Sequence, residues 1–322
     1  MSSFSASRKR FLGRLAAAVG LLGAAPRTLA QGAVAQTAAS GALAAGEPSR
    51  TARGAALLRA AHQVYDRPLV FDDPLALSVV GASAEAELRA DAWRGRGSSA
   101  LRALVVLRSR HAEDALAAAH ARGIRQALVL GAGLDTFGCR NPYAPSLKVY
   151  EVDHPATQAW KRARLAESGI AVPPALTFAP VDFERQTLGA ALAQAGFRAD
   201  QPTFVTLLGV VVYLTRDAAF ETLKFVASLP AKSEIVFDYG VTEASLSPAE
   251  AAARRAAAAR VAAIGEPWIT WFDPPLLAQQ LRSLGFSGVD DLDPDAANAR
   301  YFAGRNDALA VSRGSHIMRA RV

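Results

Sequence analysis

The stretch Leu128-Val129-Leu130-Gly131-Ala132-Gly133-Leu134-Asp135-Thr136 combines an apolar run with a loop that contains two glycines. The apolar run, Gln126–Leu130, is typical of a strand buried on both faces of a parallel sheet. Gly131 and Gly133 lack a Cβ atom, so the loop can adopt unusual backbone angles and let another group approach closely. The same G-x-G spacing occurs in ordinary turns, and Thr136 stands where a third glycine would complete the dinucleotide pattern G-x-G-x-x-G. A pyrophosphate-binding loop is therefore the less favoured interpretation.

Outward from this stretch, apolar runs alternate with helical periodicity. Further strands are expected over 148–152, 176–180, 203–208, 234–239, 288–292 and 309–312. Helices are expected over 99–120, 157–168, 188–195, 218–228 and 275–284. Ser247 and Glu250 form a capping box that predicts one more helix start. The alternation predicts an α/β protein with a doubly wound, mostly parallel, seven-stranded Rossmann-like sheet and helices on both faces.

The segment before the first strand is helix-rich, and the segment before that is different again. We expect an N-terminal helical cap over 47–123, an α/β core over 124–322, and a leader over 1–46 that is not part of the domain. Ser7-Arg8-Lys9-Arg10-Phe11-Leu12-Gly13 resembles a twin-arginine export signal with lysine in place of the second arginine. The apolar stretch that follows is too short and too rich in small residues to span a bilayer stably.

Composition excludes several classes of function. The net charge of the 322 residues is +7, but residues 1–50 hold six Lys or Arg residues and one acid, so the rest shows no nucleic-acid footprint. The single cysteine, Cys139, allows no disulfide within the chain. The five histidines show no metal-binding spacing, so no metal is expected.

Acids follow the next two predicted strands. Asp153 ends the second strand, where a carboxylate can accept hydrogen bonds from ribose hydroxyls. Because His154-Pro155 follows, Asp153 is also a candidate helix N-cap. Asp182 and Phe183 follow the third strand, where an acid and an aromatic ring could contact an adenine base. These features indicate a nucleoside cofactor without choosing between SAM (S-adenosylmethionine) and NAD.

Seven segments in order resemble the leucine carboxyl methyltransferase family, in particular its bacterial SAM-dependent branch, over about residues 48–322. They are Ser49–Ala52, Phe71–Ala76, Arg108–Arg110, Leu130–Thr136, Glu151–Pro155, Val181–Phe183 and Asn298–Phe302. The resemblance implies a class I methyltransferase fold with SAM as cofactor. The tail Arg313–Met318 looks like an expression scar, but the family often ends similarly, and we interpret it as native.

The resemblance also implies roles for individual residues. Gly131 and Gly133 would line the SAM site, Asp153 would hold the ribose, and Asp182 with Phe183 would hold the adenine. Arg50 and one of Arg108 or Arg110 would pair with the methionine carboxylate of SAM, since guanidinium binds carboxylate through two hydrogen bonds.

Two positions depart from the family pattern. Leu208 stands where the family has a glutamate before Gly209, and Phe137 stands where it has an arginine after Gly-Leu-Asp-Thr. Altered substrate chemistry, weaker SAM binding and lost activity are the alternatives that these changes raise.

The expected activity is O-methylation of a small-molecule hydroxyl or a carboxylate. The alternatives are a catalytically degenerate SAM-fold binding or regulatory protein and, more remotely, a nicotinamide-dependent oxidoreductase. Tyr213, after the fourth strand, is the candidate for positioning the acceptor, and its alternative is a core tyrosine. Trp268, Trp271 and Tyr301 are candidates for the acceptor pocket. SAM dependence favours the cytoplasm, and export through the leader is the alternative.

Overall fold

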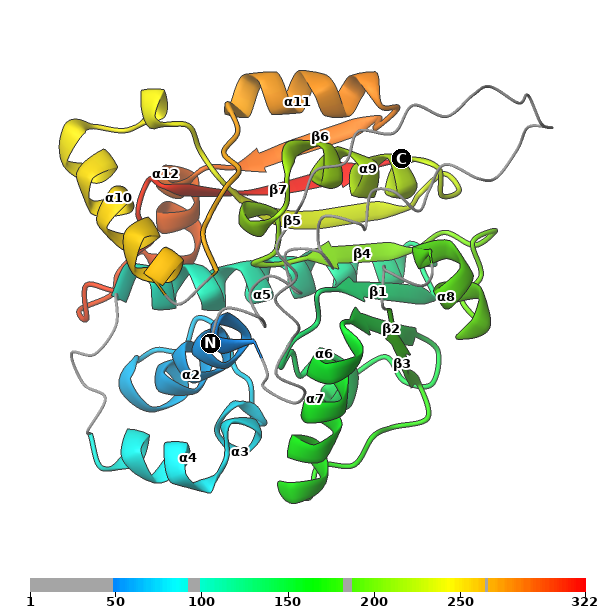
Figure 1. Ribbon diagram of the computed structural model, residues 1–322, viewed down its shortest axis with the longest axis horizontal. Helices are drawn as coiled ribbons and strands as arrows, with labels where there is room; N and C mark the ends of the chain where they lie inside the picture. The colour runs from blue at the N-terminus through cyan, green and yellow to red at the C-terminus, as the bar shows by residue number, and fades with distance from the viewer. Residues whose placement is uncertain (1–48, 92–98, 182–186, 264–265) are drawn as a thin grey trace, which may run out of the picture.

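The computed structural model describes residues 49–91, 99–181, 187–263 and 266–322. A sheet of seven strands in the order β3-β2-β1-β4-β5-β7-β6 runs through these ranges (Figure 1). The strands are β1 (Gln126–Leu130), β2 (Lys148–Asp153), β3 (Leu176–Pro180), β4 (Phe204–Leu207), β5 (Glu234–Gly240), β6 (Gly288–Leu292) and β7 (Ser315–Arg321). β1 to β5 are parallel, and β7 is antiparallel to both β5 and β6. The predicted seven-stranded, mostly parallel sheet is confirmed.

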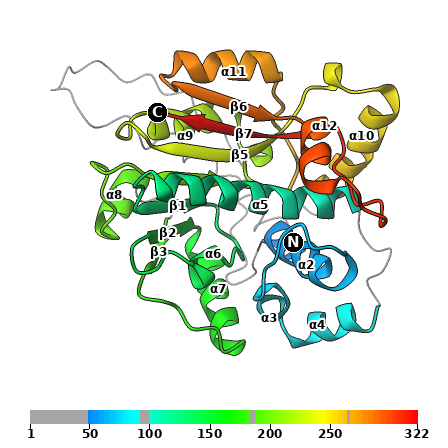
Figure 2. The ribbon, with the colours of Figure 1, turned by 180° about the vertical axis from the view of Figure 1, so that it is seen from behind.

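Helices cover both faces of the sheet because successive residues of each strand point to opposite sides. Leu128 and Leu130 of β1 join one apolar cluster with helices α8 (Leu188–Gln194), α9 (Arg216–Ala227) and α11 (Pro274–Ser283). Ala127 and Val129 join a second cluster with α5 (Ser99–Ala121). Figure 2 shows α5 lying across this second face.

A group of helices before α5 has its own apolar cluster. It consists of α2 (Arg50–Tyr65), α3 (Ala76–Val80) and α4 (Ala82–Arg89). Leu134 of the loop after β1 and Leu165 of α7 (Pro155–Glu167) complete this cluster. The helices therefore pack directly against the loop that the sequence marked as the site. The division into a leader, a helical cap and a core stays a prediction, and the leader lies outside the described residues.

The C-terminal third differs from the prediction at one strand. The strand expected over 309–312 is wrong: the backbone N–H of Val311 donates to Asn298 Oδ1 at 2.9 Å, and Asn298 Nδ2 donates to the Val311 carbonyl at 3.0 Å. The side chain of Asn298 thus takes the backbone hydrogen bonds of Val311 that a neighbouring strand would otherwise make. The seventh strand is β7, which contains most of the tail interpreted as native, and its Ile317 and Met318 are buried.

The remaining elements close the fold around the carboxyl end of the sheet. They are α6 (Phe137–Arg140), the 3₁₀ helices η1 (Val211–Tyr213) and η2 (Glu243–Ser245), α10 (Pro248–Ala263), α12 (Pro294–Ala297) and the π-helix η3 (Asn298–Phe302). The predicted capping box is confirmed: Ser247 N–H donates to Glu250 Oε2 at 2.9 Å, and Glu250 N–H donates to Ser247 Oγ at 3.3 Å. Over the ranges that the structure describes, no helix is long and apolar enough to cross a membrane.

Candidate cofactor and acceptor site

The carboxyl ends of β1, β2 and β4 meet where the strand order reverses. β1 pairs with β2 on one side and with β4 on the other. In open parallel sheets, ligands bind in the crevice outside such a point, because the loops leave the two strands in opposite directions. The predicted glycine loop, Asp153 and the segment after β4 all start at this edge.

The two glycines of the loop have positive φ angles, 69° at Gly131 and 49° at Gly133. A Cβ atom on Gly131 would lie 2.5 Å from Val210 Cγ2, and one on Gly133 would lie 3.1 Å from Ala52 Cβ. Both positions therefore need glycine for backbone conformation and for the close approach of other protein segments.

Asp153 connects the end of β2 to this loop. Its Oδ2 accepts the N–H of Gly133 at 2.6 Å, and its Oδ1 accepts the N–H of His154 at 2.7 Å. The helix-cap alternative for Asp153 is wrong, since α7 begins after His154, whose Nδ1 accepts the N–H of Ala156 at 3.2 Å. Each carboxylate oxygen has a second lone pair, so Asp153 can hold the loop and still accept hydroxyl donors.

The three candidate arginines lie in different surroundings. Arg108 of α5 reaches the ends of β4 and β5, where its Nη1 lies 3.2 Å from Asp238 Oδ2. Its guanidinium sits against Gly209, where an added Cβ would be 2.5 Å from Arg108 Nη2. Arg110 points to the surface and pairs with Asp114 at 2.8 Å. Arg50 is exposed at the first position of α2.

Asp238 is a site residue that the sequence reasoning missed. It is largely buried near the carboxyl end of β5, and its Oδ1 accepts the N–H of Gly209 at 2.5 Å. Gly209 itself has a φ of 68°. The signal was present, because an acid near the carboxyl end of a predicted parallel strand is the same pattern that singled out Asp153.

The residues predicted to contact the adenine and the acceptor do not all lie together in the structure. Asp182 and Phe183 lie outside the described residues. Tyr213 is half-buried in η1, and its hydroxyl accepts a hydrogen bond from Trp268 Nε1 at 3.3 Å. Trp268 and Trp271 pack edge to face, with 6.1 Å between ring centroids. Tyr301 packs instead against α5, where its hydroxyl lies 3.0 Å from His111 Nδ1.

The chain is similar to known proteins over most of its length. The sequence pattern that defines the leucine carboxyl methyltransferase family matches residues 52–227. The chain is 31% identical over 300 residues to the "Putative S-adenosyl-L-methionine-dependent methyltransferase YktD" of Bacillus subtilis, covering 85% of this chain and 98% of that protein. It is also 31% identical over 240 residues to a Frankia alni protein with a name of the same kind, FRAAL3718, covering 70% of this chain and 82% of that one.

The chain belongs to the leucine carboxyl methyltransferase family. It is a SAM-dependent methyltransferase. Among solved structures, it is similar to one titled as a putative methyltransferase from Thermobifida fusca, with 18% identity, a TM-score of 0.49 and coverage of 83% of this chain and 93% of the other.

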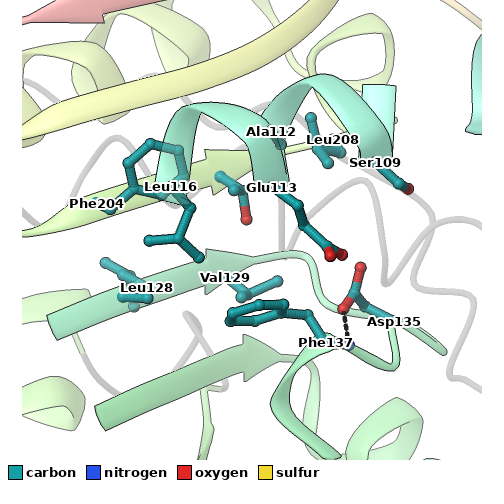
Figure 3. Close-up of a pocket in the computed structure, with 12 residues that line it drawn as sticks. Ser109, Ala112, Glu113, Leu116, Leu128, Val129, Asp135, Phe137, Phe204 and Leu208 are labelled. Atoms are coloured by element: carbon teal, nitrogen blue, oxygen red, sulfur yellow. Dashed lines mark hydrogen bonds between the residues drawn. The ribbon is translucent and has the colours of Figure 1, made fainter. Parts of the chain in front are cut away.

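The two departures of this methyltransferase from the family pattern lie together. Phe137 and Leu208 both line a small cavity between α5 and the carboxyl half of β1 (Figure 3). Its volume is about 20 Å³, close to the space that one water molecule needs. The cavity is therefore too small for the cofactor. The lining is largely apolar, and the carboxylates of Glu113 and Asp135 also border it (Figure 3).

The residues at the switch point fit SAM chemically. Asp153 has carboxylate oxygens that could accept ribose hydroxyls, the loop has no Cβ atom at Gly131 and Gly133, and Arg108 places a guanidinium, paired with Asp238, at the end of β4. Within the described ranges, no group of three or more His, Cys, Asp or Glu side chains is placed to hold a metal ion.

Proposed function

We propose that this methyltransferase transfers the methyl group of SAM to an oxygen atom of a small-molecule hydroxyl or carboxylate. The observation that carries the proposal is the phenol of Tyr213 in η1, the element that follows β4, whose oxygen accepts the indole N–H of Trp268. A phenol oriented in this way can donate its own proton to an acceptor oxygen. The acceptor of this reaction is therefore expected beside η1.

For the cofactor, we propose that Gly131 and Gly133 line the SAM site, that Asp153 binds the ribose, and that Asp182 and Phe183 contact the adenine. Arg108, with Arg50, is proposed to pair with the methionine carboxylate. Both arginines are paired with a carboxylate, Arg108 with Asp238 and Arg110 with Asp114. Arg108 is favoured because it is largely buried at the carboxyl ends of β4 and β5, whereas Arg110 lies on the surface of α5.

SAM supplies an activated methyl group, so the residues of the protein mainly align the reactants and keep water out. Proper alignment can contribute about 7–11 kcal/mol to lowering the barrier in favourable cases. A carboxylate acceptor needs no general base, whereas a hydroxyl acceptor would benefit from one. Tyr213 would position either acceptor by hydrogen bonding. SAM dependence favours a cytoplasmic location, with export of the protein through its twin-arginine-like leader as the alternative.

The alternative of a degenerate, non-catalytic protein rested on Leu208 and Phe137. Both residues line the same cavity, which is too small for the cofactor, and we propose that the two changes leave cofactor binding intact. The loop glycines and Asp153 are all present, which supports retained cofactor binding.

The test is formation of S-adenosylhomocysteine from SAM, measured over a panel of small hydroxyl and carboxylate compounds. We expect turnover with at least one of them and an O-methyl product identified by mass spectrometry and NMR. Tyr213→Phe should then lower kcat/KM for the acceptor by about tenfold, the effect of one lost hydrogen bond, with the affinity for SAM unchanged. Micromolar SAM binding without turnover on any compound would favour the degenerate alternative, and an N-methyl or C-methyl product would overturn O-methylation.

A further inference from the structure

Asp73 is a buried carboxylate whose position the methyl-transfer chemistry does not explain. It belongs to the segment Phe71-Asp72-Asp73-Pro74 between α2 and α3, and its side chain is fully buried. Burying a charged group is costly unless it is paired and hydrogen-bonded. The partners of Asp73 therefore indicate what the residue is there to hold.

The partners come from both sides of the contact between the N-terminal helices and the loop after β1. Arg59 Nε of α2 lies 2.7 Å from Asp73 Oδ2. The hydroxyl of Thr136, which immediately precedes α6, donates to the same oxygen at 2.7 Å. Arg140 Nε of α6 lies 3.5 Å from Asp73 Oδ1 and donates to Thr136 Oγ1 at 3.1 Å. One carboxylate thus joins α2 to the loop and to the short helix that follows it.

The second partner of Arg59 extends this connection toward the glycines. Arg59 Nη2 donates to the carbonyl of Leu134 at 2.5 Å, and Leu134 directly follows Gly133. Leu134 and Thr136 are therefore both tied to Asp73, one through Arg59 and one directly. The N-terminal turn of α2 also lies against Gly133, since a Cβ there would be 3.1 Å from Ala52 Cβ.

We propose that Asp73 is a positioning residue for the cofactor: it holds the loop over residues 133–136 and the start of α2 in the arrangement that binds SAM. This inference rests on the proposed cofactor site. The physical reason is preorganisation, because a loop that is already ordered loses less conformational freedom on binding than one that must be ordered by the ligand. Asp73 makes no contact with SAM in this proposal and acts only through Arg59, Thr136 and Arg140.

A matched control lies in the same helical region. Asp66 is also buried and pairs with Arg102 at 2.8 Å and with His62 at 2.8 Å. Among the hydrogen bonds and ion pairs of the described residues, none joins Asp66 to residues 131–136. Asp66→Asn should therefore resemble Asp73→Asn in its cost to thermal stability but not in its effect on the cofactor.

The experiment measures the Kd for SAM by calorimetric titration of the full chain, at a temperature where each variant is folded, together with Tm without ligand. We expect Asp73→Asn to raise the Kd by about tenfold to hundredfold, Thr136→Val to raise it by a smaller factor, and Asp66→Asn to lower Tm with a Kd within about twofold of the wild type. Thr136→Val keeps the test open if Asp73→Asn does not fold.

Asp153→Ala, measured in parallel, separates the two proposals. If Asp153→Ala leaves the Kd unchanged, the proposed cofactor site is wrong. If Asp153→Ala weakens SAM binding but neither Asp73→Asn nor Thr136→Val does, the site stands and the positioning role of Asp73 is overturned. An equal rise in Kd for Asp66→Asn and Asp73→Asn would also overturn it, because the effect would then be general destabilisation.

Discussion

Asp153 and Glu234 are both buried carboxylates at the terminus of a parallel strand. Asp153 lies at the carboxyl end of its strand and Glu234 at the amino end of another, and different groups hold them. Asp153, 5% exposed, ends β2 and is held by two backbone N–H groups. Glu234, 1% exposed, begins β5 and is paired with the guanidinium groups of Arg122 and Arg319. Within the described part of the chain, no lysine or arginine forms an ion pair with Asp153.

The difference separates a stabilising carboxylate from one that can bind a ligand. Two arginines, Arg122 and Arg319, form ion pairs with Glu234 and offset its charge. Backbone N–H groups stabilise the charge of Asp153 without cancelling it, so the carboxylate can still accept hydrogen bonds from a ligand. A buried carboxylate therefore stabilises the fold at the amino ends of the strands, and another is proposed to bind the cofactor at their carboxyl ends.

The largest expected effect is at the amino edge. Glu234→Ala should lower the free energy of unfolding by roughly 3 kcal/mol, the low end for breaking a buried ion pair, because the Arg122 side chain is 45% exposed. Urea unfolding measures this change, and the SAM affinity should stay at the wild-type value. Arg198→Ala, which removes the exposed pair with Asp200, is the control and should leave stability almost unchanged, because water and salt screen exposed ion pairs. A Glu234→Ala protein that loses SAM affinity would contradict the separation of roles.

The second effect is at the carboxyl edge and has the reverse pattern. Asp153→Ala should raise the Kd for SAM by about tenfold to hundredfold, since a hydrogen bond to a charged group contributes about 1.5–3 kcal/mol. Calorimetric titration measures the affinity, and urea unfolding should show a smaller loss of stability than Glu234→Ala. If the two variants lose stability equally and Asp153→Ala keeps the wild-type affinity for SAM, Asp153 and Glu234 do not differ in role.

The smallest effect concerns Glu151, two residues before Asp153 on β2. Its carboxyl is fully buried beside Lys161, and burial raises its pKa to about 7, although Lys161 acts in the opposite direction. The folded protein therefore binds a proton between about pH 7 and pH 4.5 that the unfolded chain does not. Stability from this group is fully present below about pH 4.5 and declines as the pH rises to about 7, by at most about 1.4 kcal/mol per pH unit, so the change over one pH unit is the smallest of the three effects.

The test compares the wild type with the double variant Glu151→Gln, Lys161→Met, which leaves no buried charge unpaired. The unfolding free energy of the wild type minus that of the double variant should fall as the pH rises from 4.5 to 7. His111, whose pKa burial lowers to about 4, gives the opposite pH trend, but it is present in both proteins and cancels in the difference. A difference that does not vary with pH would show that Glu151 stays ionised.

Much of the fold could be predicted because it depends on local patterns. β1, β3 and β6 have the predicted bounds, and β2, β4 and β5 begin and end within one residue of theirs. Apolar runs, glycine breaks and helix caps act over a few residues, so they can be read in sequence order. The strand expected over 309–312 is wrong because its backbone pairs outside this local range. Asn298, which pairs with Val311, is thirteen residues away in sequence.

The sequence by itself determined the parallel sheet, the glycine loop after β1 and the acid that ends β2. Only the tertiary structure decided that Arg108 rather than Arg110 meets Asp238, that His154 rather than Asp153 caps α7, and that Phe137 and Leu208 share one cavity. It also decided that Asp73 joins Arg59 of α2 to Thr136 after β1. Those pairings bring together residues from separate elements, and the distances between them are set by how helices pack on the sheet rather than by spacing along the chain.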